Sequence, residues 1–104
     1  MSILQPPIDN APAILQEAHR CIADRAHERD QESERSMARC VAAFNAMYGH
    51  NLSVESGWAF MVLLKMSRSV AGKVKLDDYV DGAAYFALMG EEAVSNPQLE
   101  LPLE

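Results

Sequence analysis

The apolar run WAFMVLL, from Trp58 to Leu64, constrains the fold of this 104-residue chain more than any other stretch. It lies in the first of two segments with helical periodicity, at about residues 53–71 and 77–93. A helix that is apolar on nearly all sides belongs in the middle of a core rather than at its edge. We therefore expect these two segments to form an antiparallel helix hairpin at the centre of the domain.

Start and stop signals bound both helices of this hairpin. Ser53 is a favourable N-cap, and Glu55 lies in the first turn, where the helix dipole favours an acidic side chain. The first helix is expected to run to about Val70 and to end at Gly72. Asp77 is the predicted N-cap of the second helix, whose first turn is also acidic.

A further helix is expected from about Ala11 to Ala26. Asn10 is a good N-cap, and Pro12 falls in the first turn, where its missing N–H leaves no hydrogen bond unmade. The apolar residues of this segment recur at helical spacing and should form its buried stripe: Ile14, Leu15, Ala18, Ile22 and Ala26.

The segment between this helix and the hairpin begins polar and ends apolar. Residues 27–36, HERDQESERS, are interpreted as a solvated loop, with a helix starting at Ser33 or Glu34. That helix is expected to continue to Tyr48, with Gly49 ending it in the position that glycine favours. The complete prediction is an all-α domain of four helices.

The helical domain is expected to span residues 10–94. Residues 1–9 contain Pro6 and Pro7, which oppose helix formation, so this segment is interpreted as an extended arm. Residues 95–104, SNPQLELPLE, break the helical pattern and are interpreted as a flexible tail. The alternating leucines of the tail leave open that it packs on a partner subunit.

Composition restricts the partners and the location of the chain. Nine basic and fifteen acidic residues give a formal net charge of −6. Nucleic-acid binding requires a basic face, so direct binding is not expected. No apolar run reaches membrane-spanning length and no signal-peptide pattern is present, so we expect no membrane association and a cytoplasmic location. Cys21 and Cys40 are expected to be buried free thiols.

One group of residues combines charges of both signs. Lys65 and Arg68 lie near the end of the first hairpin helix. Asp78 and Asp81 open the second helix on one face, one turn before Tyr85. In an antiparallel hairpin the basic and acidic groups meet as salt bridges, Arg68 near Asp78 and Lys65 near Asp81 or Tyr85. Alternatively, the two carboxylates share a hard cation such as magnesium.

The chain also resembles a family of short phage and prophage proteins of unknown function, over about residues 29–93. The resemblance rests on an apolar helix ending in L-L-K-x-x-R, here closing with Lys65 and Arg68. It also rests on an acidic helix with the pattern D-x-V-D-x-x-x-Y-x-x-L, here from Asp78 to Leu88. This helix pair is similar in turn to all-α nucleoside triphosphate pyrophosphohydrolases of the MazG type.

The second resemblance implies a magnesium site. In MazG-type enzymes, one helix supplies Glu-x-x-Glu and the next supplies Glu-x-x-Asp, and together they bind magnesium around the triphosphate. Asp78 and Asp81 match the spacing of the second motif. The first motif is absent, because Lys65 and Arg68 stand where its acids would be, so catalysis is not expected. Three other acids remain as replacement ligands: Glu32, Glu34 and Glu55.

Three functions follow as hypotheses. The first is a phage or prophage accessory protein that binds a nucleotide or another phosphate-containing ligand, with these candidate residues: Lys65, Arg68, Asp78, Asp81, Tyr85 and Glu34. The second is a magnesium-dependent nucleotide pyrophosphohydrolase. The third is an inhibitor that presents an acidic surface to a basic host defence or nucleic-acid-binding protein. A homodimer is expected, because Met- and Ala-rich helices often bury a face against a copy, and the similar pyrophosphohydrolases are dimers or tetramers.

Overall fold

A computed structural model of the chain describes residues 7–29 and 36–95, except for the side chains of residues 25–29. These residues form four helices and no strand: α1 (Ala11–Arg29), α2 (Ser36–Tyr48), α3 (Val54–Ser69) and α4 (Leu76–Ser95). The predicted all-α fold of four helices is therefore confirmed. Residues 1–6 of the predicted arm and residues 96–104 of the predicted tail lie outside the described residues. None of the described helices is long and apolar enough to cross a membrane.

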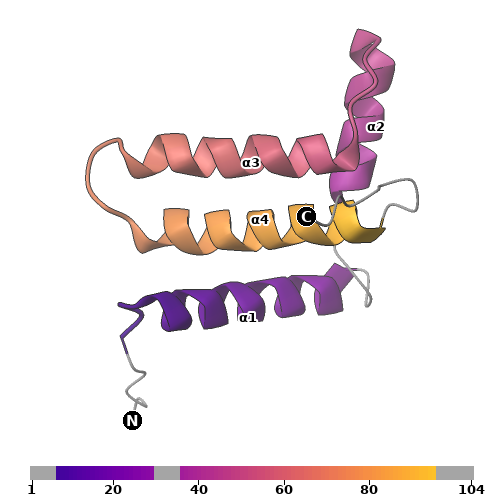
Figure 1. Ribbon diagram of the computed structural model, residues 1–104. Coiled ribbons are helices and arrows are strands. Elements are labelled where there is room, and N and C mark those ends of the chain that lie inside the picture. Colours follow the sequence, from indigo (N-terminus) through magenta and orange to yellow (C-terminus); the bar gives the residue numbers. More distant parts are fainter. Residues whose placement is uncertain (1–6, 30–35, 96–104) are drawn as a thin grey trace, which may run out of the picture.

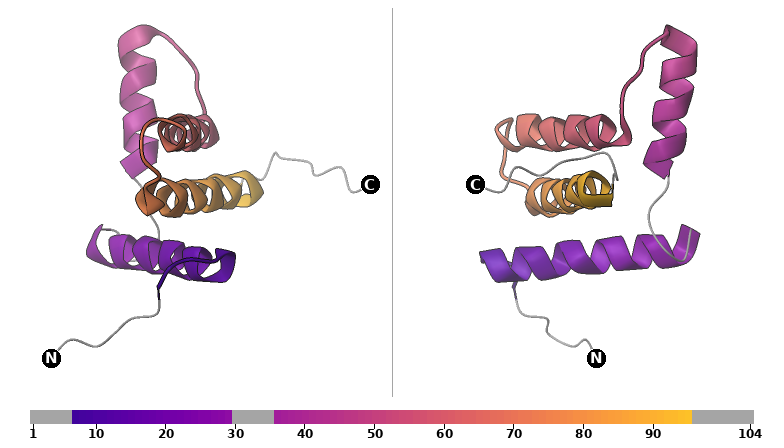
Figure 2. Two further views of the ribbon diagram at one scale, coloured as in Figure 1. Left: turned by 90° about the vertical axis from the view of Figure 1, so that its left-hand side faces the viewer. Right: turned by 45° about the vertical axis from the view of Figure 1, so that its right-hand side comes forward.

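Helix α4 lies between α3 and α1. Figure 1 shows α3 and α4 side by side and antiparallel, joined by the loop of residues 70–75, with α1 along the other side of α4. Helix α2 packs on α3 alone among the helices and projects from the layer that the other three form (Figure 2). The predicted antiparallel hairpin is present, and α4 packs against α3 on one side and α1 on the other.

Side-chain caps start two of the helices as predicted. The Asn10 Oδ1 accepts a hydrogen bond of 2.9 Å from the backbone N–H of Ala13. Ser53 has extended backbone angles, and its Oγ accepts a bond of 3.0 Å from the N–H of Ser56. Each bond satisfies an N–H that the first helical turn leaves without an intrahelical partner. These caps fix where α1 and α3 begin.

Two glycines with positive φ follow helices, where a side chain would be strained. Gly49 has φ 68° after α2, and Gly72 has φ 72° after α3, as their sequence positions predicted. The start of α4 differs from the prediction. The helix begins at Leu76, so Asp77 lies inside its first turn and is not the N-cap. The chain turns earlier because the Asp78 N–H already bonds to the Lys75 carbonyl at 3.1 Å.

The connection between α2 and α3 is held by one side chain that the sequence did not single out. The Asn45 side chain accepts a hydrogen bond of 2.9 Å from the Leu52 N–H and donates one of 3.0 Å to the Leu52 carbonyl. A paired contact of this kind fixes the backbone of residues 49–53 against the last turns of α2. The direction in which α2 leaves α3 is therefore defined by side-chain bonding as well as by packing.

The core between α1 and α4 is built from small side chains. Ala18, Val80 and Ala84 are its buried residues, and neighbouring side chains of both helices pack around them: Ile14, Cys21, Ile22 and Ala83. Small residues let two helix backbones approach closely. The predicted stripe is wrong at Leu15, which is 62% exposed, because it faces away from α4.

The expectation that the apolar run of α3 lies in the middle of a core is wrong. Trp58 is 5% exposed and stacks on Tyr85 of α4, with ring centroids 5.6 Å apart. Phe60 and Leu63 are 68% and 60% exposed. Helix α3 is covered by α4 on one side and by α2 over only part of another. No described element covers its remaining face.

At Gly57, side chains of α2 pack directly against the backbone of α3. A Cβ built there would overlap the Met37 sulfur and lie 2.8 Å from Val41 Cγ2, whereas a Cβ at Gly90 of α4 would meet nothing within 4 Å. Gly90→Ala should therefore stabilise the protein by about 1 kcal/mol through helix propensity. The free energy of unfolding of Gly57→Ala should be lower than that of Gly90→Ala by roughly 1–3 kcal/mol, the usual cost of overpacking.

Urea denaturation of the two variants beside the parent chain measures this difference. The variants are matched, because each replaces a helical glycine with alanine. Equal stabilisation by both substitutions would contradict the close packing of α2 on α3.

Candidate functional site

A cluster of three ionised groups lies in the seam between α3 and α4. The Lys65 ammonium is 3.0 Å from Asp81 Oδ2 and 4.0 Å from Asp78 Oδ1. The side chains of Lys65 and Asp78 are 12% and 8% exposed, and that of Asp81 is 29% exposed. A Cβ at Gly82 would lie 3.6 Å from Lys65 Cβ, so α4 carries no side chain where the lysine stem crosses it. The salt bridge predicted between Lys65 and Asp81 is present.

This cluster does not fit a magnesium site. The Lys65 ammonium pairs with Asp81 at 3.0 Å and approaches Asp78 to 4.0 Å, so a metal ion shared by the two carboxylates would lie beside a positive charge. Among the described residues, no three or more potential ligand side chains come together. Glu55 lies ten residues from Lys65 on α3, which is about 15 Å along a helix. Glu34 lies outside the described residues.

Helix α2 also brings no acid to this place. Its described sequence, SMARCVAAFNAMY, contains no carboxylate, and α2 does not contact α4. In the enzymes that the sequence resembles, a second pair of acids completes the metal site. Within the described part of the chain, only the half of that arrangement formed by Asp78 and Asp81 exists, and Lys65 neutralises it.

Arg68 lies one turn beyond the seam and is exposed. It was predicted to pair with Asp78, but Lys65 makes that contact instead. Arg68 lines a small cavity of about 150 Å³ at the loop end of the hairpin, together with Ala71, Lys75 and Asp78. Two cations therefore flank a hollow in which the nearest carboxylate is already paired with Lys65.

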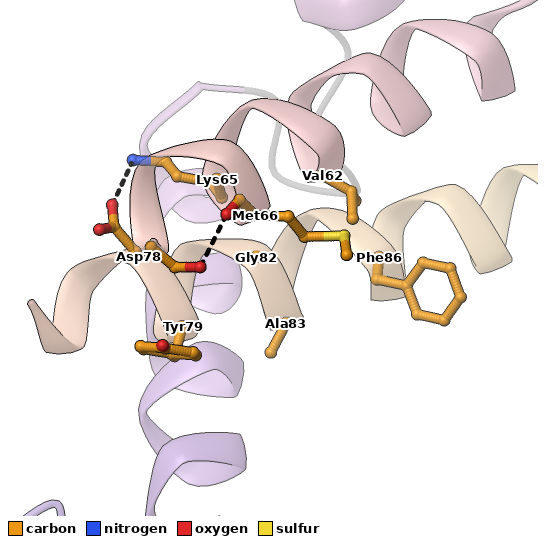
Figure 3. Close-up of a pocket in the computed structure, with 9 residues that line it drawn as sticks. Val62, Lys65, Met66, Asp78, Tyr79, Gly82, Ala83 and Phe86 are labelled. Atoms are coloured by element: carbon orange, nitrogen blue, oxygen red, sulfur yellow. Dashed lines mark hydrogen bonds and ion pairs between the residues drawn. The ribbon is translucent and has the colours of Figure 1, made fainter. Parts of the chain in front are cut away.

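A larger and mainly apolar cavity of about 400 Å³ opens along the side of the hairpin (Figure 3). Tyr79 and Phe86 of α4 form its aromatic walls, and Val62 and Met66 line it from α3. Asp78 lines this cavity as well as the small one, so the two hollows adjoin at that residue. The hairpin therefore offers an apolar pocket next to a basic one.

The sequence analysis missed Tyr79, Phe86 and Lys75 as lining residues. The signal for the aromatic walls was available, because Tyr79 and Phe86 are seven residues apart and so share a face of α4. Tyr85, which was selected as a ligand-binding candidate, instead stacks on Trp58 inside the seam and lines neither cavity.

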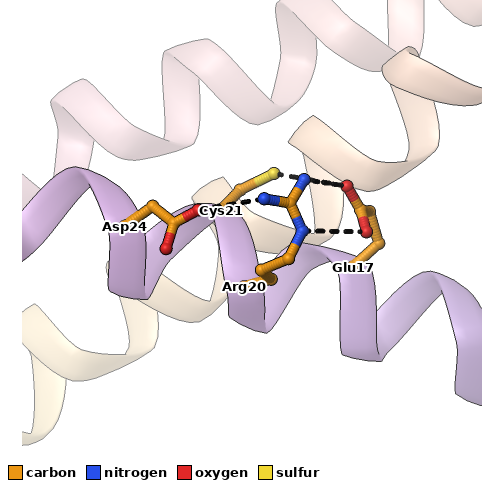
Figure 4. A network of polar contacts seen from close by, with 4 residues as sticks. All are labelled: Glu17, Arg20, Cys21 and Asp24. Atoms are coloured by element: carbon orange, nitrogen blue, oxygen red, sulfur yellow. Dashed lines mark hydrogen bonds and ion pairs between the residues drawn. The ribbon is translucent and has the colours of Figure 1, made fainter.

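A second polar network lies on α1 (Figure 4). Arg20 forms ion pairs with Glu17 one turn before it and, at 2.9 Å, with Asp24 one turn after it. The hydrogen bond from Arg20 lowers the pKa of Glu17 below its ordinary value of 4.5 and raises the pKa of Arg20. The Cys21 thiol lies 4.0 Å from Glu17. All three charged groups belong to one helix face, which makes this network a helix-stabilising feature.

Both cysteines are free thiols, as predicted. Cys21 is partly buried against the α1–α4 core, whereas Cys40 is exposed. The prediction that both are buried is wrong for Cys40, because it lines the open groove between α2 and α3 and not a closed core.

Comparison with known proteins places the chain in a family without assigning an activity. Residues 13–93 match the family described as a domain of unknown function (DUF6378), and the chain belongs to that family. The matched segment contains most of α1 and α4 and all of α2 and α3, together with the ion cluster and both cavities. No curated protein and no solved structure matches the chain.

Removing the Lys65 charge should lower the free energy of unfolding, because two carboxylates lose their counter-charge. Lys65→Met leaves Asp78 buried without its counter-charge, a change that typically costs about 3–5 kcal/mol. Replacing Asp81 and Lys65 together would still strand Asp78, so full recovery requires the triple variant Lys65→Met/Asp78→Leu/Asp81→Leu. Denaturant unfolding with and without magnesium measures both variants.

Asp77→Ala is the control for that experiment, because Asp77 is exposed and has no described ion pair. It should lower stability by at most about 1 kcal/mol, the usual contribution of an acid in the first turn of a helix. We expect magnesium to alter none of these curves. A magnesium-dependent stabilisation that requires Asp78 and Asp81 would contradict the salt-bridge assignment and restore the metal site.

The depressed pKa of Glu17 gives a prediction for acidic pH. A carboxyl group with a lowered folded-state pKa contributes stability at neutral pH, and this contribution is lost as the pH falls through that pKa. Glu17→Gln should therefore lower the thermal midpoint at neutral pH, and the difference should disappear as the pH falls through the lowered pKa of Glu17. Glu91→Gln is a suitable control on another exposed helix position. A difference that persists in acid would contradict the ionic origin.

Proposed function

We propose that this chain is a small phage or prophage accessory protein that binds a nucleotide or another phosphate-containing ligand on the α3–α4 hairpin and does not hydrolyse it. The observation that carries the proposal is the adjacency of two hollows that share Asp78. One is apolar with aromatic walls, and the other is flanked by Arg68 and Lys75. An apolar ring joined to a phosphate group matches this pair of surfaces.

The dimensions of the larger hollow suit a small molecule. At about 400 Å³ it falls in the lower part of the range of about 300–1,000 Å³ for small-molecule pockets. Tyr79 and Phe86 would contact a planar ring on its face or edge. The planar guanidinium of Arg68 would bind phosphate oxygens in a bidentate manner, with Lys75 as a second positive charge.

The local charge supports an anionic ligand despite the acidic chain. Asp78 and Asp81 are neutralised in part by Lys65, and the loop after α3 adds Lys73 and Lys75. The remaining acid at the N-terminal end of α4 is Asp77. It lies in the first turn, where it offsets the helix dipole. A phosphate approaching from the loop end therefore meets cations first.

Binding without hydrolysis follows from the donor set. Magnesium-dependent phosphate chemistry needs carboxylates free to hold the metal ion. Here the two acids at the correct spacing are held by an ammonium group of the same chain. The resemblance to short phage and prophage proteins and to pyrophosphohydrolases supports a helical scaffold that retains ligand binding while its metal half-site is replaced by an internal ion pair.

A thermal-shift series with inorganic phosphate, adenosine, AMP and ATP, each with and without magnesium, tests the proposal. We expect the nucleotides to stabilise the protein more than phosphate or adenosine alone, because they fill both hollows. The stabilisation should not depend on magnesium, and no pyrophosphate should be released from ATP.

Lys75→Ala and Lys73→Ala form a matched pair for this experiment, because both remove a lysine from the same loop. Only Lys75 lines the basic hollow. Lys75→Ala should weaken nucleotide binding by roughly tenfold, as expected for the loss of one charge-assisted contact, and Lys73→Ala should change it little. Equal effects of both substitutions, or no shift with any nucleotide, would contradict the proposed site.

A further inference from the structure

Helices α2 and α3 enclose a groove on the face of α3 that turns away from α4. The cavity has a volume of about 470 Å³. Its walls include Val41 and Phe44 from α2 and Phe60, Met61 and Leu63 from α3. None of its lining residues also lines the two hollows of the hairpin, so this groove is a separate surface.

Large apolar side chains stand exposed along this face. Phe60 and Leu63 are 68% and 60% exposed, and Leu52 at the connection is 45% exposed. On α2, Phe44 is 38% exposed and Met47 is 74% exposed. Met47 follows the groove residue Cys40 by seven positions and so lies on the same side of α2. A contiguous apolar face of this kind on a small protein marks an interaction surface.

The charge of this region identifies the kind of partner. From Ser36 to Leu64 the sequence contains one basic residue, Arg39, and one acidic residue, Glu55, apart from the neutral His50, while the whole chain carries −6. This face has no excess of acids to attract a basic partner. It also has no group of cations to attract an anionic membrane surface. A second copy of the chain meets the least electrostatic repulsion where the shared negative charge is absent, and this face meets that condition.

We propose that the groove between α2 and α3 is a homodimer interface, in which this face of one copy packs against the same face of a second copy. Phe60 and Leu63 form an exposed wall of the groove. A twofold axis would place this wall of each copy against the groove of the other. Such an isologous contact closes after two copies and leaves no face for further growth.

The area is of the order that an interface needs. Five exposed side chains at roughly 100 Å² each give about 500 Å² before the groove walls are counted. A stable interface buries about 800 Å² on each partner. The ligand site proposed above lies on other surfaces, so the dimer and ligand binding can fail independently of each other.

Light scattering on Leu63→Glu and Leu15→Glu tests the interface. Both substitutions place the same charge at exposed helical leucines, 60% and 62% exposed, and only Leu63 lines the groove. We expect the parent chain and Leu15→Glu to show twice the monomer mass of 11.5 kDa. Leu63→Glu should show the monomer mass with an unchanged helical circular dichroism spectrum. A monomeric parent chain, or a dimeric Leu63→Glu variant, would overturn the proposal.

Thiol labelling of the unmodified chain provides a test that needs no substitution. Cys40 lines the groove and Cys21 packs near the α1–α4 core, so peptide mass analysis after maleimide treatment reads the two sites separately. The labelling rate of Cys40 should fall at least several-fold as protein concentration rises, while that of Cys21 stays constant. A Cys40 rate that does not depend on concentration, in a chain that light scattering finds dimeric, would place the dimer on another face and overturn the inference.

Discussion

The ion cluster of Lys65, Asp78 and Asp81 is the constraint on which the hairpin depends. Two carboxylates and one ammonium group, two of them nearly buried, lie in the seam between α3 and α4. Desolvated charges favour one register of the hairpin, because a shift along either helix would leave one of them unpaired in a poorly hydrated seam. The same pairing fixes the chemistry, since it occupies the carboxylates that a metal ion would require. The two hollows are lined by residues of α3, α4 and their loop, so the ion pairs that fix the hairpin register also position these lining residues.

The molecule combines a well-defined centre with thinly covered outer helices. Helix α4 packs on α1 through alanine and valine and on α3 through charges and the Trp58–Tyr85 stack. Helix α2 depends on Gly57 and on the two hydrogen bonds of Asn45. Apolar burial is the main driving force of folding, and here much apolar surface of α3 stays exposed in the single chain. This exposed face is the apolar surface through which one copy of the chain could associate with another.

The sequence predicted the elements well because helix ends carry local signals. Asn10, Ser53, Gly49 and Gly72 act within one turn of their own positions, and all four behave as their chemistry indicates. The antiparallel hairpin predicted Lys65 near Asp81 or Tyr85, and the structure pairs it with Asp81. The same argument paired Arg68 with Asp78, where Lys65 lies instead. The exposure of Phe60 and Leu63 could not be predicted, because periodicity shows that a helix is apolar but not which neighbour covers it. The basic hollow depends on the path of the loop that carries Lys75, which no spacing rule gives.

The arrangement of the helix contacts also determines an order of assembly. Helices α3 and α4 are joined by a short loop, so closing the hairpin costs little chain entropy. The contact of Ala18 with Val80 and Ala84 instead joins segments that are more than 60 residues apart in sequence. Contacts between distant segments form later, since the chain must first be closed over that length. The hairpin with its paired charges would thus form as a template, and α1 would be the last helix to dock.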